Sequence, residues 1–199
     1  MRRFVVFGLA LLLSACATTP SSRSSAQQAR AWQAHQASVG GLQGWALFGR
    51  IAISTEDEAW SGKLRWRQAP ASYQIQFEAP FGQGAMRLNG DAAGVVMQVV
   101  NGERYTAPDA ESLLYRFFGM HLPLQGMKYW VTGLPEPSLP KLMEYDAAGR
   151  LARLEQAEWR IRYEAYRRVD GVDLPQKIEL VNHALNLRLV IDRWGIEAG

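Results

Sequence analysis

The sequence has few of the side chains from which active sites are built. It contains one cysteine, Cys16, so the chain cannot form an internal disulfide. Its three histidines, His35, His121 and His183, are far apart, and none has an aspartate, glutamate or cysteine at metal-ligand spacing. It has no nucleophile-elbow, phosphate-loop or dinucleotide-binding motif. These absences favour a binding protein over an enzyme.

The N-terminal apolar run is too short to span a bilayer. Residues 4–13 form an apolar segment behind Arg2 and Arg3, which is typical of a signal peptide. The small residues Ser14 and Ala15 then lead directly into Cys16. We therefore expect residues 1–15 to be removed as a signal peptide.

Residues 13–16, with the sequence LSAC, resemble the lipobox of bacterial lipoproteins. The resemblance implies that Cys16 becomes the mature N-terminus and carries an S-linked diacylglycerol and an N-acyl chain. Several acyl chains anchor a protein stably, whereas one alone does so only marginally. Ala17 resembles the residue that directs Gram-negative lipoproteins to the outer membrane. The alternative is an ordinary secretory signal followed by a chance cysteine.

The mature chain is almost neutral. The sequence has 22 basic and 19 acidic residues, and the signal peptide removes two of the basic ones. The basic pI therefore does not indicate a nucleic-acid partner. Residues 16–29 are rich in Ser, Thr and Gln, which predicts a flexible tether beyond the lipidated cysteine. We expect residues 30–199 to form a single domain and the protein to be a monomer.

From residue 42 onward the pattern is mainly β. Segments such as 45–53 and 60–66 place large apolar groups or a glycine at every second position. Tight turns between them predict an antiparallel meander of about eleven strands, which curls into an incomplete barrel. Two inserted helices are predicted, one from Asp109 to Gly119 and one over 124–132. They would form a short lid over either a filled core or an open apolar cavity.

The hairpin over residues 73–88 has an unusual tip. Pro80, Phe81 and Gly82 form its turn, where polar residues are usual. Judged by the local residues alone, Phe81 is better interpreted as folding back onto a neighbouring core. The other interpretation is an exposed apolar probe.

Over the whole mature chain, the order and spacing of short motifs resemble the LolB family of outer-membrane lipoprotein receptors. Besides the lipobox, the resemblance is carried by residues 49–50, Trp66, residues 80–82, 102–107, 109–111, 119–120 and 122–124, Trp130, residues 133–135, Trp159, Tyr163, Tyr166, residues 174–175 and Trp194.

This resemblance implies an incomplete barrel whose helical lid covers an apolar cavity. It further implies a protein that accepts acylated lipoproteins from the periplasmic carrier LolA and inserts them into outer-membrane phospholipid. No nucleotide would be used, and the lipid on Cys16 would be the only bound group. The protein would lie at the periplasmic face of the outer membrane. Its acyl-chain cavity is expected to be lined by Trp45, Leu47, Ile51, Leu64, Trp66, Tyr73, Ile75, Phe77, Met86, Leu88, Phe117, Trp130, Trp159 and Ile161.

The family also has an apolar residue at the tip of a protruding loop, commonly an aliphatic one. Phe81 stands in that place, so the resemblance favours the exposed interpretation and a membrane-insertion loop made of Pro80, Phe81 and Gly82. Two alternatives stay open. One is an outer-membrane lipoprotein with a filled core and a structural or assembly role. The other is a lipid hydrolase, for which no nucleophile and base are evident.

Overall fold

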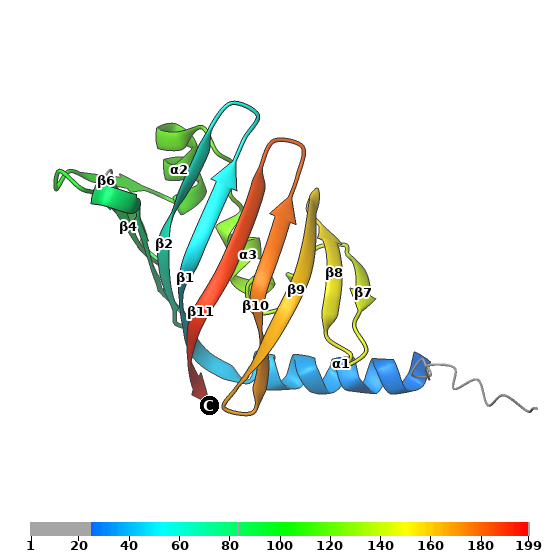
Figure 1. Ribbon diagram of the computed structural model, residues 1–199. Coiled ribbons are helices and arrows are strands. Elements are labelled where there is room, and N and C mark those ends of the chain that lie inside the picture. The colour runs from blue at the N-terminus through cyan, green and yellow to red at the C-terminus, as the bar shows by residue number, and fades with distance from the viewer. Residues whose placement is uncertain (1–24, 83, 199) are drawn as a thin grey trace, which may run out of the picture.

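The computed structural model describes residues 25–82 and 84–198. Its centre is one antiparallel sheet of eleven strands in the order β6-β5-β4-β3-β2-β1-β11-β10-β9-β8-β7 (Figure 1). The first strand pairs with the last, and β6 and β7 form the two free edges. The sheet curves without closing, which confirms the predicted open antiparallel architecture.

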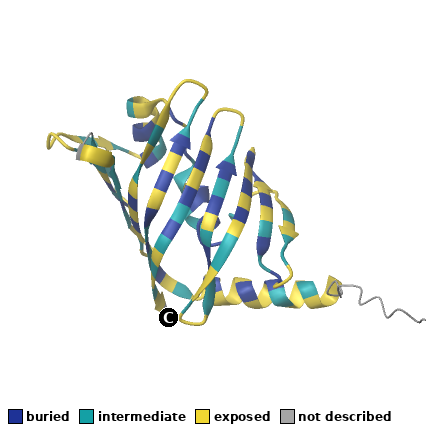
Figure 2. Cartoon of the chain, viewed as in Figure 1, coloured by how far each residue is buried: buried dark blue, intermediate teal, exposed yellow. Residues whose placement is uncertain are grey.

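The strands follow the alternating segments of the sequence. Their bounds are β1 (Leu42–Ser54), β2 (Ala59–Gln68), β3 (Tyr73–Glu78), β4 (Ala85–Asp91), β5 (Gly94–Val99), β6 (Arg104–Ala107), β7 (Leu142–Tyr145), β8 (Leu151–Gln156), β9 (Trp159–Val169), β10 (Val172–Val181) and β11 (Asn186–Ala198). Buried and exposed residues alternate along the central strands (Figure 2), because successive side chains point to opposite faces of a sheet.

Helices α2 (Ala110–Phe118) and α3 (Leu124–Trp130) lie on one face of the sheet, as Figure 1 shows. We call this the lid face and the opposite one the outer face. A single 3₁₀ turn, η1 (Pro80–Gly82), joins β3 to β4. Among the described residues, none of the helices combines the length and the apolar character needed to cross a membrane.

Helix α1 (Ser25–Gly40) crosses one end of the sheet. It begins at Ser25, so residues 25–29 of the predicted flexible tether are helical. Trp32 and His35 share its buried face, and their rings contact Tyr145 and Tyr166 at centroid distances of 5.3 and 6.1 Å. The other tether residues and Cys16 lie outside the described residues.

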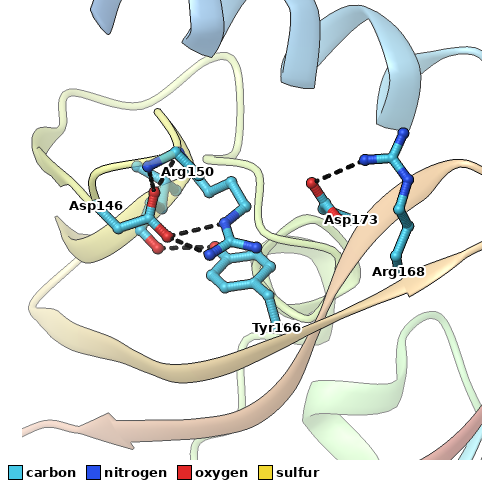
Figure 3. Close-up of polar contacts among 7 residues, drawn as sticks. Asp146, Arg150, Tyr166, Arg168 and Asp173 are labelled. Atoms are coloured by element: carbon cyan, nitrogen blue, oxygen red, sulfur yellow. Dashed lines mark hydrogen bonds and ion pairs between the residues drawn. The ribbon is translucent and has the colours of Figure 1, made fainter. Parts of the chain in front are cut away.

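A polar cluster fixes the strands beneath α1 (Figure 3). The Arg150 guanidinium pairs with Asp146 at 2.7 Å and lies 4.4 Å from the centroid of the Tyr166 ring. Beside it, Arg168 pairs with Asp173 at 3.5 Å. These contacts join the β7–β8 turn to β9 and β10, so α1 packs on a firm surface.

Candidate functional site

The local sequence fixes both ends of helix α2. The Asp109 carboxylate accepts a hydrogen bond from the backbone N–H of Ser112 at 2.7 Å, and so caps the first turn. Gly119 ends the helix with φ of 65° and donates its N–H to the Tyr115 carbonyl. Leu113 and Leu114 are buried beneath the helix. The predicted bounds of this helix are therefore confirmed.

A partly open apolar cavity lies between the lid helices and the first strands. Its volume is about 100 Å³, and every side chain around it is aliphatic, aromatic or a methionine. The lining residues are Ile51, Ile53, Trp60, Leu64, Trp66, Ile75, Phe77, Met86, Leu88, Leu114, Phe118, Met120, Leu122, Leu124, Met127 and Leu187. This space is smaller than the roughly 300–1,000 Å³ of sites that hold drug-sized ligands.

Half of the residues predicted for an acyl-chain cavity line this space. They are Ile51, Leu64, Trp66, Ile75, Phe77, Met86 and Leu88, all on strands β1 to β4. Position 62 on β2, beside these residues, requires glycine, because a Cβ there would lie only 2.7 Å from the Phe77 ring. The absent side chain lets Phe77 lie across β2 and form one wall of the cavity.

The structure places the other predicted residues away from this cavity. Trp130, Trp159 and Ile161 are buried in the second half of the sheet, where Trp130 and Trp159 pack with ring centroids 6.2 Å apart. Leu47 is also enclosed in the core. That half of the lid face is therefore a filled core, while the half under α2 contains the cavity.

Trp45 and Tyr73 lie at the far end of the strands. Trp45 packs between Trp66 and Trp194, with ring centroids 5.2 and 5.7 Å away. Both residues border a separate groove of about 880 Å³ whose wall also contains Arg67 and Asp91. Polar groups of this kind do not suit an acyl chain. Burial raises the pKa of the Tyr73 hydroxyl to about 12, so it stays neutral.

Phe117 lies on the wrong side of α2 for the cavity. Its ring packs against Tyr105 of β6 at 4.3 Å, while Phe118 lines the cavity. Residues four apart share a helix face, so Leu114 and Phe118 point together into the cavity. The prediction placed Phe117 in the acyl-chain cavity, whereas the structure directs Phe117 toward β6 and Phe118 into the cavity.

Sequence reasoning missed the remaining lining residues, although most of them carried a usable signal. Ile53 and Trp60 continue the apolar alternation of β1 and β2, and Leu187 does so in β11. Met120 and Leu122 lie in the connection between the two lid helices, where no periodic pattern marks them. The other missed residues, all from the lid, are Leu114, Phe118, Leu124 and Met127.

The η1 loop exposes its phenylalanine completely. The Phe81 side chain is 98% exposed, so it does not fold back onto the core. Its backbone has φ of 56° and ψ of 24°, in the left-handed region that non-glycine residues seldom adopt. A hydrogen bond of 2.8 Å from the Ala79 N–H to the Gly84 carbonyl closes the loop. The loop therefore holds an apolar tip in water at some conformational cost.

In the part of the chain that the structure describes, no three His, Cys, Asp or Glu side chains gather in a way that could hold a metal ion. The features that stand out are instead an apolar cavity and an exposed apolar tip on the same half of the sheet. Together they suit the handling of apolar chains.

Comparisons with known proteins agree with this description. The family described as "Outer membrane lipoprotein LolB" matches residues 43–194. The "Outer-membrane lipoprotein LolB" of Nitrosococcus oceani is 40% identical over 185 residues, covering 92% of each chain. Its namesake in Pseudomonas putida KT2440 is 36% identical and covers 98% of this chain and 96% of its own.

The fold also resembles a solved structure of low sequence identity. A putative outer membrane lipoprotein-sorting protein domain from Vibrio parahaemolyticus superposes with a TM-score of 0.52 at 8% identity, covering 85% of this chain and 92% of its own. At this identity the likeness concerns the fold alone. The sequence matches decide the family: this chain belongs to the outer-membrane lipoprotein LolB family.

Proposed function

We propose that this protein accepts acylated lipoproteins from the periplasmic carrier LolA and inserts them into the outer membrane without using a nucleotide. Family membership gives the broader role, which is lipoprotein localisation at the outer membrane by a protein that is not an enzyme. The steps of capture and insertion are the part that we propose.

The apolar cavity under the lid helices is the observation that carries this proposal. Each buried CH₂ of an acyl chain is stabilised by about 0.8 kcal/mol, so chains released into water would be strongly disfavoured. Transfer therefore needs an apolar surface at every stage. The side chains around the cavity supply such a surface, and the sheet and the lid helices cover part of it.

An acyl chain needs more room than about 100 Å³, so part of the lid must move to admit it. Helix α3 is held at its end, because the Tyr163 hydroxyl donates to the Trp130 carbonyl at 2.9 Å and Trp130 is fully buried. Helix α2 is less firmly covered, since Tyr115 is 53% and Phe118 37% exposed. Outward movement of α2 would enlarge the cavity while α3 stays in place.

The exposed loop supplies the insertion step. Phe81 would enter the bilayer and bring the cavity to the membrane surface. The lipid on Cys16 would tether the protein at the periplasmic face of the same membrane. The free energy of transfer would come from the difference in affinity of the acyl chains for the carrier, this cavity and the bilayer.

A transfer assay tests the proposal. The unlipidated mature chain with Cys16→Ser is mixed with LolA carrying a triacylated lipoprotein, and the location of the cargo is determined by pull-down without nucleotide. We expect the cargo to move to this protein. Cargo that stays on the carrier, with the acceptor shown to be folded, would leave the structural or assembly role as the better account.

A further inference from the structure

A second hollow lies on the outer face, beside the base of the η1 loop. Its volume is about 550 Å³, and Pro80 and Phe81 form one wall. The outward-facing side chains of Arg50 on β1, Lys63 on β2 and Arg188 on β11 border the rest. We call this hollow the basic groove. It is separated from the acyl-chain cavity by the thickness of the sheet.

The strand register explains why the three cations surround an open floor. Arg50 is directly opposite Lys63 on β2, and two residues further along β1 Ala52 is opposite both Ser61 and Arg188. Ala52 and Ser61 are small, so nothing fills the space between the long basic side chains. The result is a shallow basin with positive groups at its rim.

The acidic residues nearby leave this basin positive. Arg50 pairs with Asp192 at 3.0 Å and Arg188 with Glu179 at 3.4 Å, and both arginine side chains are largely exposed. Glu78, the acidic residue in the wall, pairs with Arg65 at 2.8 Å. Lys63 has no carboxylate partner among the described residues. The Arg50–Asp192 pair is exposed and contributes little, and Glu179 also pairs with Arg162, so Arg50 and Arg188 can both turn to another anion at small cost.

We infer that the basic groove binds the phosphate groups of anionic phospholipids in the bilayer that Phe81 enters. This inference rests on the proposed insertion role of the η1 loop. The groove and the apolar tip share Pro80 and Phe81, so a bilayer that receives the tip also meets the groove. Interfacial segments bury their apolar groups about 5–10 Å into the boundary between headgroups and acyl chains, so cations beside the tip are near the headgroup phosphates. Arginine and lysine are the side chains that best pair with phosphate.

This contact would fix the orientation of the protein on the membrane. A single apolar tip allows rotation about itself, whereas a tip with three flanking cations gives several points of attachment. The end of the sheet that carries η1 then stays at the bilayer surface, with the mouth of the cavity beside it. The lid face, with α2 and the cavity, remains accessible to the carrier.

Vesicle binding by the unlipidated Cys16→Ser chain tests the inference in the absence of cargo. A Lys63→Gln/Arg188→Gln variant is compared with Lys141→Gln/Arg160→Gln, which removes the same charge from exposed positions in the other half of the sheet, outside the basic groove. Co-sedimentation uses vesicles of phosphatidylcholine alone and of phosphatidylcholine mixed with phosphatidylglycerol. We expect the groove variant to bind the mixed vesicles roughly thirtyfold more weakly, and the control variant to lose less than threefold.

Equal losses in the two variants would overturn the inference, because net charge would then explain the binding. Unchanged binding by the groove variant would also overturn it. So would normal vesicle binding combined with lost cargo transfer from LolA, which would make the groove a docking site for the carrier. If the vesicle result is as expected but wild-type chain takes no cargo, the proposed function fails and the lipid site stands.

Discussion

Gln156 accepts the indole N–H of Trp130 at 2.8 Å, and this bond joins the end of α3 to strand β8. The same carboxamide accepts the backbone N–H of Glu136 and donates to the carbonyls of Glu136 and Leu139. Gln156 is 3% exposed and Trp130 fully buried. The filled half of the sheet therefore contains an almost saturated polar network that holds one lid helix in place.

Replacing Gln156 with leucine should destabilise the protein by roughly 3 kcal/mol. The change leaves the Trp130 indole N–H and the Glu136 backbone groups buried without partners, and each such group costs about 1–3 kcal/mol. Urea denaturation followed by tryptophan fluorescence measures the change. Gln125→Leu, at an exposed position on α3, is the matched control and should shift the free energy of unfolding by less than about 0.5 kcal/mol. Equal effects at the two positions would contradict the role of the network.

Phe81→Asn should separate stability from membrane binding. Asparagine adopts the left-handed conformation of this position more readily, so the free energy of unfolding should rise by about 1 kcal/mol. Loss of the apolar ring should weaken vesicle binding at least tenfold and impair cargo insertion, because burying a phenylalanine contributes about 1.5–3 kcal/mol.

Phe81→Leu is the control for this change, since it keeps an apolar tip without relieving the backbone. It should insert cargo nearly as well as the wild-type protein. Phe81→Glu should leave cargo binding in place and block insertion. Normal insertion by the asparagine or glutamate variant would show that the tip has no part in the transfer.

Adjacent leucines on α2 offer a test of the cavity. Leu114 lines the cavity, whereas Leu113 is 1% exposed and does not line it. Leu114→Phe should be accommodated in the empty volume, changing stability by less than about 1 kcal/mol, and Leu113→Phe should cost about 1–3 kcal/mol through overpacking.

Binding of an acylated peptide gives the second readout for this pair. It should weaken about tenfold in Leu114→Phe, because the new ring occupies space that the chain needs. Displacement of an apolar fluorescent probe measures it. If Leu114→Phe binds the peptide as tightly as the wild-type protein, the acyl chain occupies some other surface.

Local signals in the sequence were sufficient for the strands and for α2. The alternation of apolar residues placed β1 and β2, and Asp109 and Gly119 marked the helix ends, because these features depend on near neighbours. The division of the lid face was not predictable in this way. Trp130 belongs to the filled half because of Gln156, which is 26 residues away. Likewise, Phe118 rather than Phe117 lines the cavity because of how α2 docks on the sheet, which the helical period does not specify.

The burial of His35 predicts that the stability of the protein depends on pH. Its side chain is buried between α1 and the sheet, its Nε2 has no hydrogen-bond partner in the described structure, and burial lowers its pKa. Asp173 and Asp146 oppose this shift and Arg150 reinforces it, but desolvation is the largest cause. The unfolded chain, in which the pKa is about 6.5, therefore binds a proton more readily than the folded one.

The contribution of buried, neutral His35 to the free energy of unfolding is consequently complete above pH 6.5. It declines as the pH falls below that value. We expect the urea midpoint to drop between pH 7.5 and pH 5.5, and His35→Gln to flatten this part of the profile. His183→Gln, at an exposed position, should retain the wild-type slope. A slope that survives in His35→Gln would assign the pH dependence to other groups. Helix α1 leads toward the proposed anchor at Cys16. Protonation of His35 should therefore also weaken the packing of α1 on the sheet. Faster hydrogen exchange of the α1 amides at pH 5.5 than at pH 7.5 would detect this weakening.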